Sequence, residues 1–477
     1  MMNLARKVGC TSLSHSNNKV RNEEVHIRTV QEHFPRLDNF TLYLPNNLDI
    51  DQILEENPPE FKFKRDKFVY ILSLIYSIPT QKKDKIENYS GFTPISKSIL
   101  GSVIKDYRQY IDHLKELNIV EEDSHYIVEK KTQGLRFIEA YRKPVKPVTI
   151  TDWCLIKNIV YLRKNIDKTK TQELHYLRKW FLDGKLNVNI DAARTYLTDE
   201  WKKDLENPEI LYPDIRLNSR ILPIERLNSK SKNPLFFVDK TAGRLHTNFT
   251  QLKSELRKYV SYDGKILCSV DISNSQPYLL NSLLSKELYE RNDMKDRIRR
   301  TNLTLSNADI IKLDSLIDSI SQKEDVILFR ELINSGQFYE KFGEVLHSRG
   351  IIDSNFLREK AKEITFCTIF NKNNAINYAQ SIRIFKNLFP NVYEVIKSVK
   401  KGHHPTLAII LQNLEAELIL HKTCKVISEE HPEIPLFTLH DSIITTEENK
   451  DIVQAKMIEI LSQNLNYEPN LKVEEWK

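Results

Sequence analysis

The segment from Leu267 to Leu280, LCSVDISNSQPYLL, constrains the fold of this 477-residue chain more than any other stretch. An apolar run typical of a buried strand ends abruptly in a carboxylate, Asp271, and a polar cluster with a proline follows. The plainest interpretation is that Asp271 or a polar neighbour caps the next helix, because such side chains satisfy free backbone N–H groups there. The alternative is that the strand delivers a carboxylate to a functional site.

Length and composition predict a globular protein of two or three domains. A chain of 477 residues exceeds the usual size of one core, and 40% hydrophobic with 29% charged residues is an ordinary globular composition. The longest apolar stretch, residues 68–78, is too short to span a bilayer, and the N-terminus lacks a secretory signal pattern. Five scattered cysteines without a Cys-x-x-Cys pair favour reduced thiols and argue against a zinc site. We expect a cytoplasmic monomer with no membrane partner.

Positive charge is concentrated near Asp271. Residues 201–300 hold nineteen Lys and Arg against thirteen Asp and Glu, a surplus of six that equals the net charge of the whole chain. A basic band of this kind suits a polyanionic partner, although a solvated protein face has the same composition.

The N-terminal part predicts a small domain after a weakly structured segment, 1–60. Within 61–145, apolar spacing predicts helices over 65–77, 94–101 and 102–118, and then a β-hairpin within 119–140. Three helices followed by a hairpin is the order of a winged helix, whose third helix can read a major groove. A small packing domain is the alternative.

The rest of the chain predicts mixed helix and sheet. Residues 146–234 are first Lys-rich and irregular and then helical, which suggests a linker or thumb-like region. Residues 235–477 contain candidate strands at 235–238, 266–270 and 436–439 with long helices between them. We therefore expect an α+β chain.

A second strand also ends in an acid. In PLFTLHDSIITT, apolar runs flank His440-Asp441-Ser442, which predicts Asp441 at the tip of a tight β-hairpin. An Asp at such a tip is common turn chemistry. Two carboxylates at two strand ends can also meet in one sheet, where a pair of them suits Mg²⁺ completed by substrate phosphates.

A helix predicted over 355–370 carries a third candidate element. Arg358, Lys362, Phe366 and Phe370 recur every four residues and therefore share one helical face. Two cations followed by two aromatic rings fit a triphosphate followed by a base. An amphipathic helix with snorkelling cations has the same pattern.

In order and spacing, these residues resemble the motifs of the family A DNA polymerases, the bacterial polymerase I class. Asp271 and Ser273 match the Asp and Ser of its motif A, a strand ending in Asp-x-Ser-x-x-Glu. The stripe from Arg358 to Phe370 matches motif B, Arg-x3-Lys-x3-Phe-x3-Tyr-Gly, and His440-Asp441-Ser442 matches motif C, His-Asp-Glu.

Four weaker matches lie around these motifs. They are Thr241–His246 for the Thr-Gly-Arg-Leu-Ser segment, Phe385–Pro390 for Phe-Phe-x-x-Tyr-Pro, Gln412–Glu417 for Gln-Gly-x-Ala-Ala-Asp, and Leu471–Glu474 for the closing strand. The resemblance covers roughly residues 235–477, and the shared order of the motifs excludes the helix-cap interpretation of Asp271. It implies a right-hand polymerase palm and fingers after the winged-helix-like domain.

Three departures from the motifs bear on sugar choice. Gln276 replaces the Glu that discriminates against ribonucleotides, Phe370-Asn371 replaces Tyr-Gly, and Ser442 replaces the last acid of motif C. Gln276 is nearly isosteric with Glu, so we expect it to block ribonucleotides sterically and the protein to use deoxynucleotides. We also expect this side chain, called the gate below, to be held less firmly than the Glu and therefore to discriminate less sharply. The single-subunit RNA polymerases share the palm and carry His-Asp-Ser, and they are the alternative. A catalytically inactive DNA-binding replication protein is the other.

The resemblance implies a DNA polymerase that extends a primer on a template with dNTPs, replicating mobile-element, phage or plasmid DNA. Two Mg²⁺ ions would be held by Asp271, Asp441 and the carbonyl of Ile272. Arg358 and Lys362 would neutralise phosphate charge, and Phe366, Phe370 and Gln276 would complete the nucleotide site. Arg244, Gln412 and His440 would contact the primer–template.

Overall fold

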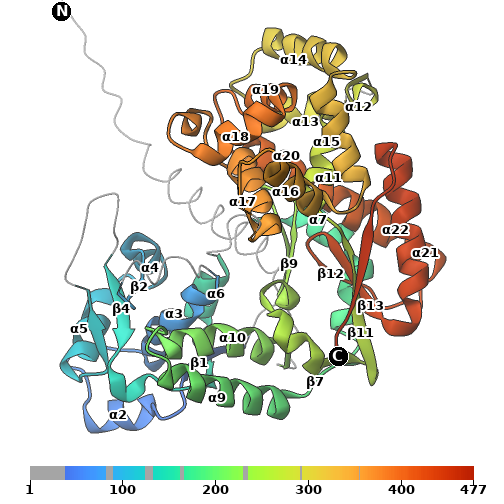
Figure 1. Ribbon diagram of the computed structural model, residues 1–477. Helices are drawn as coiled ribbons and strands as arrows, with labels where there is room; N and C mark the ends of the chain where they lie inside the picture. The colour runs from blue at the N-terminus through green and yellow to red at the C-terminus, as the bar shows by residue number, and fades with distance from the viewer. Residues whose placement is uncertain are drawn as a thin grey trace, which may run out of the picture. The chain divides into compact units, whose positions relative to one another are not determined.

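The computed structural model describes residues 38–81, 90–123, 133–161, 166–228, 235–290, 293–353 and 355–477. Two compact units divide the chain: the N-terminal unit takes the residues up to Lys164 and Asp204–Ser219, and the C-terminal unit takes Asn165–Lys203 and Arg220–Lys477 (Figure 1). Among the described residues, no helix has the length and apolar character that a membrane-crossing segment requires.

The N-terminal unit combines a helical core with two small antiparallel sheets. Its elements are β1 (Phe40–Pro45), α2 (Ile50–Glu56), α3 (Arg65–Gln81), β2 (Thr93–Pro94), α4 (Lys97–Val103), α5 (Tyr107–Glu116), β3 (Val120–Glu122), β4 (Gly134–Phe137), η3 (Glu139–Tyr141), β5 (Val145–Ile150) and α6 (Trp153–Tyr161). One sheet pairs β1 with β5, and the other has the order β2-β4-β3.

The helices expected in this region are present with shifted ends. The helix predicted over 65–77 is α3, which buries Phe68, Val69 and Leu72 completely. The helix expected from residue 94 begins later, because Pro94 lies in β2 and Ser96 caps α4 by accepting from the N–H of Ile99. The two strands of the hairpin predicted within 119–140 are β3 and β4, which pair antiparallel. Residues 124–132 between them lie outside the described part of the chain.

Two segments predicted to be irregular are ordered. Of the segment 1–60, residues 1–37 are not described, but β1 and α2 follow, with Leu44 and Leu54 buried. The first residues of 146–234 form β5, which pairs with β1 along its whole length, from Phe40 opposite Ile150 to Pro45 opposite Val145. The prediction missed this ladder because its two strands are about a hundred residues apart, and a pairing between such distant segments has no local signal in the sequence.

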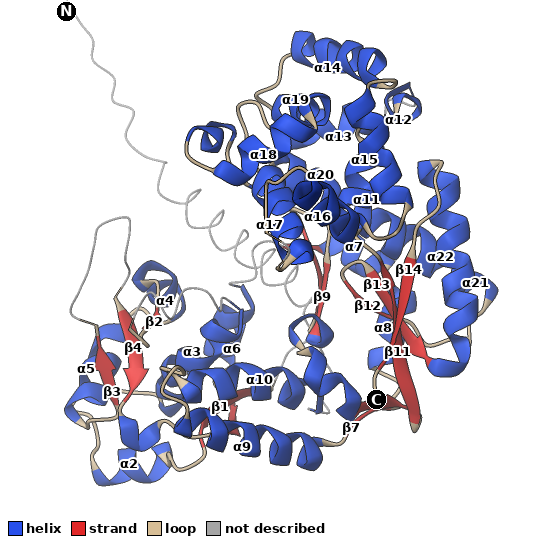
Figure 2. Cartoon of the chain, viewed as in Figure 1, coloured by secondary structure: helices blue, strands red, loops and turns tan. Residues whose placement is uncertain are grey.

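The C-terminal unit has a central sheet and a large helical region (Figure 2). Its first elements are β6 (Ile166–Asp167), α7 (Lys168–Glu173), α8 (His175–Arg178), η4 (Lys179–Phe181), β7 (Leu186–Val188), α9 (Ile190–Glu206), α10 (Pro213–Asn228), β8 (Phe236–Asp239), β9 (Leu245–Thr247), η5 (Asn248–Gln251), η6 (Ser254–Tyr259), β10 (Val260–Tyr262) and β11 (Lys265–Ile272). The chain passes between the units within α9 and α10.

The helical region and the end of the chain follow β11. The elements are α11 (Ser275–Ser282), α12 (Lys286–Glu290), α13 (Asp293–Thr301), α14 (Asn307–Ile320), α15 (Glu324–Asn334), α16 (Phe338–Ser348), α17 (Leu357–Phe370), η7 (Asn373–Asn377), α18 (Gln380–Leu388), α19 (Pro390–Val399), α20 (Thr406–Ala416), the π-helix η8 (Glu417–Cys424), α21 (Lys425–Glu430), β12 (Phe437–Leu439), β13 (Ser442–Thr446), η9 (Glu447–Asn449), α22 (Lys450–Leu465) and β14 (Leu471–Glu475). The candidate strands at 235–238, 266–270 and 436–439 correspond to β8, β11 and β12.

The central strand of the main sheet is β11. The sheet has the order β12-β13-β11-β10-β7, and β14 pairs antiparallel with β11 as well. Leu267, Cys268 and Val270 have no exposed surface, and α22 packs against β11, β13 and β14 (Figure 2). A strand buried in this way needs the continuous apolar run that the sequence has there.

Candidate active site

The two predicted strand ends meet. In the β11–β13 ladder, Asp271 lies opposite Ser442, and Asp441 is the residue immediately before Ser442. Leu439 pairs with Ser442, so Asp441 lies in the tight β12–β13 turn as predicted, and His440 there has a φ of 57°. The helix-cap interpretation of Asp271 is wrong, because α11 has Asn274 at its N-cap position.

The Asp441 carboxylate adds to the cost of ionising Asp271. Burial is the largest cause that raises the pKa of Asp271, and the neighbouring Asp441 carboxyl group is the next; together with smaller effects they take it from its ordinary value of 3.8 to about 7. Arg257 opposes this shift, but its guanidinium is already engaged by Glu474 at 2.9 Å. Excess negative charge at two strand ends is the condition under which a cation binds.

The donor set fits a hard divalent ion. Asp271 and Asp441 offer carboxylate oxygens, and the carbonyl of Ile272, the next residue of β11, stays the third donor that the sequence predicts. Across the described ranges, no three His, Cys, Asp or Glu side chains are grouped to hold a metal ion. Two carboxylates with the remaining positions left to water and phosphate are the ligand set that Mg²⁺ accepts and that Zn²⁺ does not prefer.

The predicted stripe lies along one face of α17. Arg358, Lys362 and Phe370 are exposed, and Phe366 is half-buried. The Lys362 ammonium lies 5.4 Å from the Phe366 ring centroid, and the Phe366 and Phe370 rings are 5.5 Å apart. Arg358 pairs with Glu340 through Nε at 2.7 Å, and both side chains are more than 40% exposed, so this ion pair is readily exchanged for another anion.

Tyr339 on α16 lies beside two members of the α17 stripe, and no sequence pattern indicates it. Its ring centroid lies 5.8 Å from the Arg358 guanidinium and 6.2 Å from the Phe366 ring centroid. Burial raises its pKa, Arg358 lowers it and Asp441 raises it again, so the hydroxyl lies within the electrostatic reach of both. α16 packs against α17, and α17 against α20 (Figure 1).

Glu415 is a third acid of the site that sequence reasoning missed. It lies on α20 with 1% of its side chain exposed, and it accepts from Arg244 Nη2 at 2.7 Å and from Gln276 Nε2 at 3.2 Å. The pKa of Glu415 is raised to about 7. Burial is the main cause, Arg244 opposes it, and Asp441 and Asp271 contribute to the rise. The available signal was an acid beside the buried Leu411 and Leu414 of an apolar helix.

The segment before β9 is folded to present Arg244. Asp239 accepts from the backbone N–H groups of Thr241, Ala242 and Arg244, and its carboxylate also contacts His246 Nε2 at 3.0 Å. A carboxylate that collects several N–H groups in this way fixes a tight turn.

Four polar atoms in this region are buried without a protein partner. They are Arg244 Nε, Arg257 Nε, Gln276 Oε1 and His440 Nδ1. Each such atom costs about 1–3 kcal/mol unless a ligand or water satisfies it. Arg244 and His440, two of the residues predicted to contact the primer, therefore lie near the acidic strand ends, and so does Gln276, the residue predicted to control sugar choice. The third contact, Gln412, is half-buried on α20, three residues before Glu415.

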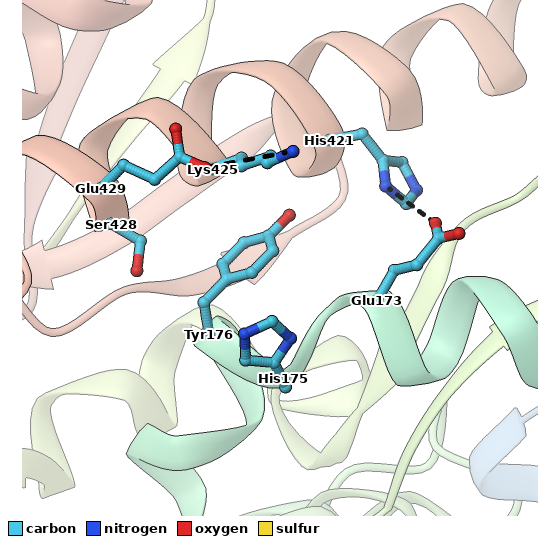
Figure 3. Close-up of a pocket in the computed structure, with 7 residues that line it drawn as sticks. All are labelled: Glu173, His175, Tyr176, His421, Lys425, Ser428 and Glu429. Carbon is cyan, nitrogen blue, oxygen red and sulfur yellow. Dashed lines mark ion pairs between the residues drawn. The ribbon is translucent and has the colours of Figure 1, made fainter.

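A separate cavity of about 640 Å³ contains none of the predicted site residues. Its lining consists of Glu173, His175, Tyr176, His421, Lys425, Ser428 and Glu429 (Figure 3). The Tyr176 hydroxyl donates to the carbonyl of Leu420 at 2.7 Å, and Glu173 lies 3.9 Å from His421 Nδ1. Acidic and basic groups are mixed and partly paired there, with Lys425 Nζ also 4.0 Å from Glu429 Oε1.

Comparison with known proteins gives no family. No protein-family model matches the sequence, and no curated protein matches it. Among solved structures, the chain is similar to the POL domain of Pol1 from M. smegmatis in complex with DNA primer-template and dNTP, at 10% identity and a TM-score of 0.32 over 68% of this chain and 73% of that chain. At that level of similarity, the case for a function depends on the site itself.

Removing one carboxylate should stabilise the metal-free protein. Because the pKa of Asp271 is raised to about 7, wild type loses free energy of unfolding as pH rises from about 4 to about 7. Asp271→Asn abolishes this titration, so its stabilising effect should grow across that window and stay constant above it. Urea unfolding in EDTA at about pH 5 and about pH 8 measures both values. A stability difference between the variant and wild type that is the same at both pH values would contradict the raised pKa of Asp271.

Proposed function

We propose that the C-terminal unit is a template-directed nucleotidyltransferase, a DNA polymerase that extends a primer with dNTPs. The observation that carries this proposal is the meeting of Asp271 and Asp441 at adjacent strand ends. Neither acid caps a helix, and together they hold more negative charge than neighbouring cations compensate. The exposed cationic stripe of α17 and the buried polar atoms of Arg244 and Gln276 supply the remaining requirements for a nucleotide and a primer end.

Asp271 and Asp441, with the carbonyl of Ile272, would hold two Mg²⁺ ions. When bound, these ions favour the deprotonated primer hydroxyl and stabilise the departing pyrophosphate. The primer 3′ oxygen forms a bond to the α-phosphorus of the dNTP, and the bond from that phosphorus to the β-phosphate bridging oxygen breaks. The chain's own part is to fix the carboxylates rigidly at the ends of a paired ladder.

The α17 stripe would receive the nucleotide. Arg358 would exchange Glu340 for phosphate oxygens, and Lys362 would add a second positive charge one turn away. Phe366 and Phe370 would stack on the base and the sugar. Arg244, Gln412 and His440 would contact the primer–template, and burial and the Arg244 charge keep His440 neutral by lowering its pKa.

Two other functions share some of these features. A single-subunit RNA polymerase would retain His440-Asp441-Ser442, but Gln276 is a bulky residue where that class usually has a small one. An inactive DNA-binding protein is disfavoured on energetic grounds. A half-buried carboxyl group whose pKa is raised by its surroundings and by a second acid lowers stability in the absence of a cation, and such a cost is usually retained where it serves function.

We also infer that the N-terminal unit contains a winged helix that contacts DNA. Support comes from the order α3, β2, α4, α5, β3, β4 and the three-stranded antiparallel sheet. The cations of α5 and α4 are already engaged. Glu122, with 7% of its side chain exposed, pairs with Lys97, Arg108 and Lys115 at 2.8, 2.9 and 3.2 Å. DNA phosphates would have to compete with this carboxylate.

Primer extension tests the main proposal. Asp271→Ala or Asp441→Ala should lower Mg²⁺-dependent extension of a primed template by roughly a hundredfold or more while leaving duplex affinity nearly unchanged. Asp318→Ala on α14, which removes an exposed carboxylate paired with Lys286, is the matched control and should extend normally. Extension by either site variant within about tenfold of wild type would refute the assignment.

Removing the charge of Glu122, which pairs with Arg108 and Lys115 of α5, tests whether the N-terminal unit contacts DNA. Burial would raise the pKa of Glu122, but hydrogen bonds from Arg108 and Lys97 lower it to about 2, so this residue is ionised at neutral pH. Glu122→Gln should therefore increase DNA affinity and steepen its dependence on salt, because freed cations neutralise more phosphates. Glu121→Gln, on the same strand and paired with Arg136, is the control. If the DNA affinity of Glu122→Gln depends on salt concentration as wild type does, the proposed DNA contact is contradicted and the domain has only a packing role.

A further inference from the structure

Glu415 is a buried carboxylate at a position where the resembled Gln-Gly-x-Ala-Ala-Asp motif has alanine. It joins three elements that are far apart in the chain: α20, the turn before β9 that carries Arg244, and the first turn of α11 that carries Gln276. An acid with 1% exposure is retained only where donors satisfy it, and Glu415 has two of them. It therefore replaces an apolar residue with an ordered hydrogen-bonding centre.

Gln276 and Arg244 each have one further polar atom that is available to a ligand. Because Gln276 Nε2 donates to Glu415, its Oε1 is left as an acceptor, and that atom is buried without a protein partner. Because Arg244 Nη2 donates to the same carboxylate, its Nε is left as a donor, and it too lacks a protein partner. A free amide could turn either end toward a ligand, but this one is held in a single orientation.

We infer that Glu415 is a positioning residue of the nucleotidyl-transfer site, holding Gln276 Oε1 as a fixed acceptor for a sugar hydroxyl and Arg244 Nε as a fixed donor at the primer end. This inference rests on the proposed function. It also corrects the expectation of a loosely held gate at Gln276, because the amide is anchored by Glu415 in place of an aromatic hydroxyl on α17.

The same contact accounts for glutamine at position 276. A carboxylate there would lie about 3.2 Å from the Glu415 carboxylate, in a region that already contains Asp271 and Asp441. The acid and the amide therefore depend on each other. When Gln276→Glu and Glu415→Gln are made together, the contact still joins one amide donor to one carboxylate. Gln276→Glu alone leaves two carboxylates in the contact, and Glu415→Gln alone leaves two amides.

The competing explanation is that Glu415 only neutralises Arg244 within the fold. In that case the identity of residue 276 would not matter to Glu415, and substitutions at the two positions would act independently. The exchange of the two side chains separates these explanations.

The experiment compares wild type with Gln276→Glu, Glu415→Gln and the double variant that carries both changes. Single-nucleotide insertion is measured with a dNTP and with the matching rNTP, each resolved into kcat and KM, beside the melting temperature. Each single variant should change the dNTP-to-rNTP ratio of kcat/KM by roughly tenfold or more. In the double variant the contact between residues 276 and 415 is restored, so its dNTP-to-rNTP ratio should return to within about threefold of wild type. Its kcat should stay lower for both nucleotides, because Arg244 still lacks its carboxylate partner. Glu417→Gln, the same change on an acid that pairs with Arg297, should leave the ratio unchanged.

Each outcome decides a different point. Additive effects without recovery in the double variant, or single variants that keep the wild-type ratio while only the melting temperature falls, overturn the positioning role and leave the polymerase proposal intact. Failure of folded wild type to insert any nucleotide overturns the proposed function and this inference together. Gln276→Glu substitutes a half-buried residue, so it remains informative if Glu415→Gln alone does not fold.

Discussion

The antiparallel ladder between β11 and β13 is the interaction on which the candidate site depends. It places Asp271 opposite Ser442, and the tight turn before β13 then puts Asp441 beside Asp271. A shift of one residue would turn Asp271 toward the other face of the sheet and separate the carboxylates. β14 pairs with the other edge of β11 over Cys268–Ile272 and holds the same register.

The ladder must hold this register against electrostatic repulsion. Asp271, Asp441 and the buried Glu415 are three acids in one region, and the raised pKa values of Asp271 and Glu415, both about 7, express the cost of ionising them there. The buried apolar face of β11 and the packing of α22 supply the opposing stabilisation. A fold that keeps such a charge concentration is prepared for a cation and for the phosphates that accompany it.

The strand ends were predictable from the sequence because each has a local signal: an apolar run, an acid and turn residues. The stripe of α17 was predictable for the same reason, since helical spacing alone places its members on one face. Glu415 and Tyr339 were not predictable in this way. Their roles come from contacts with Arg244, Gln276 and Arg358, which lie on other elements, and single-sequence patterns do not reveal such contacts. β1 and β5 were missed because the signal for their pairing is equally non-local.

Locating a bound metal ion and nucleotide tests the central claim most directly. A crystal of the protein with primed template, a dNTP that cannot react and Mn²⁺ in place of Mg²⁺ would show the ion by its anomalous scattering. We expect an anomalous peak within ligand distance of both Asp271 and Asp441, with the triphosphate against Arg358 and Lys362. Metal and nucleotide bound away from the two strand ends, for example in the cavity beside His175 and His421, would contradict it.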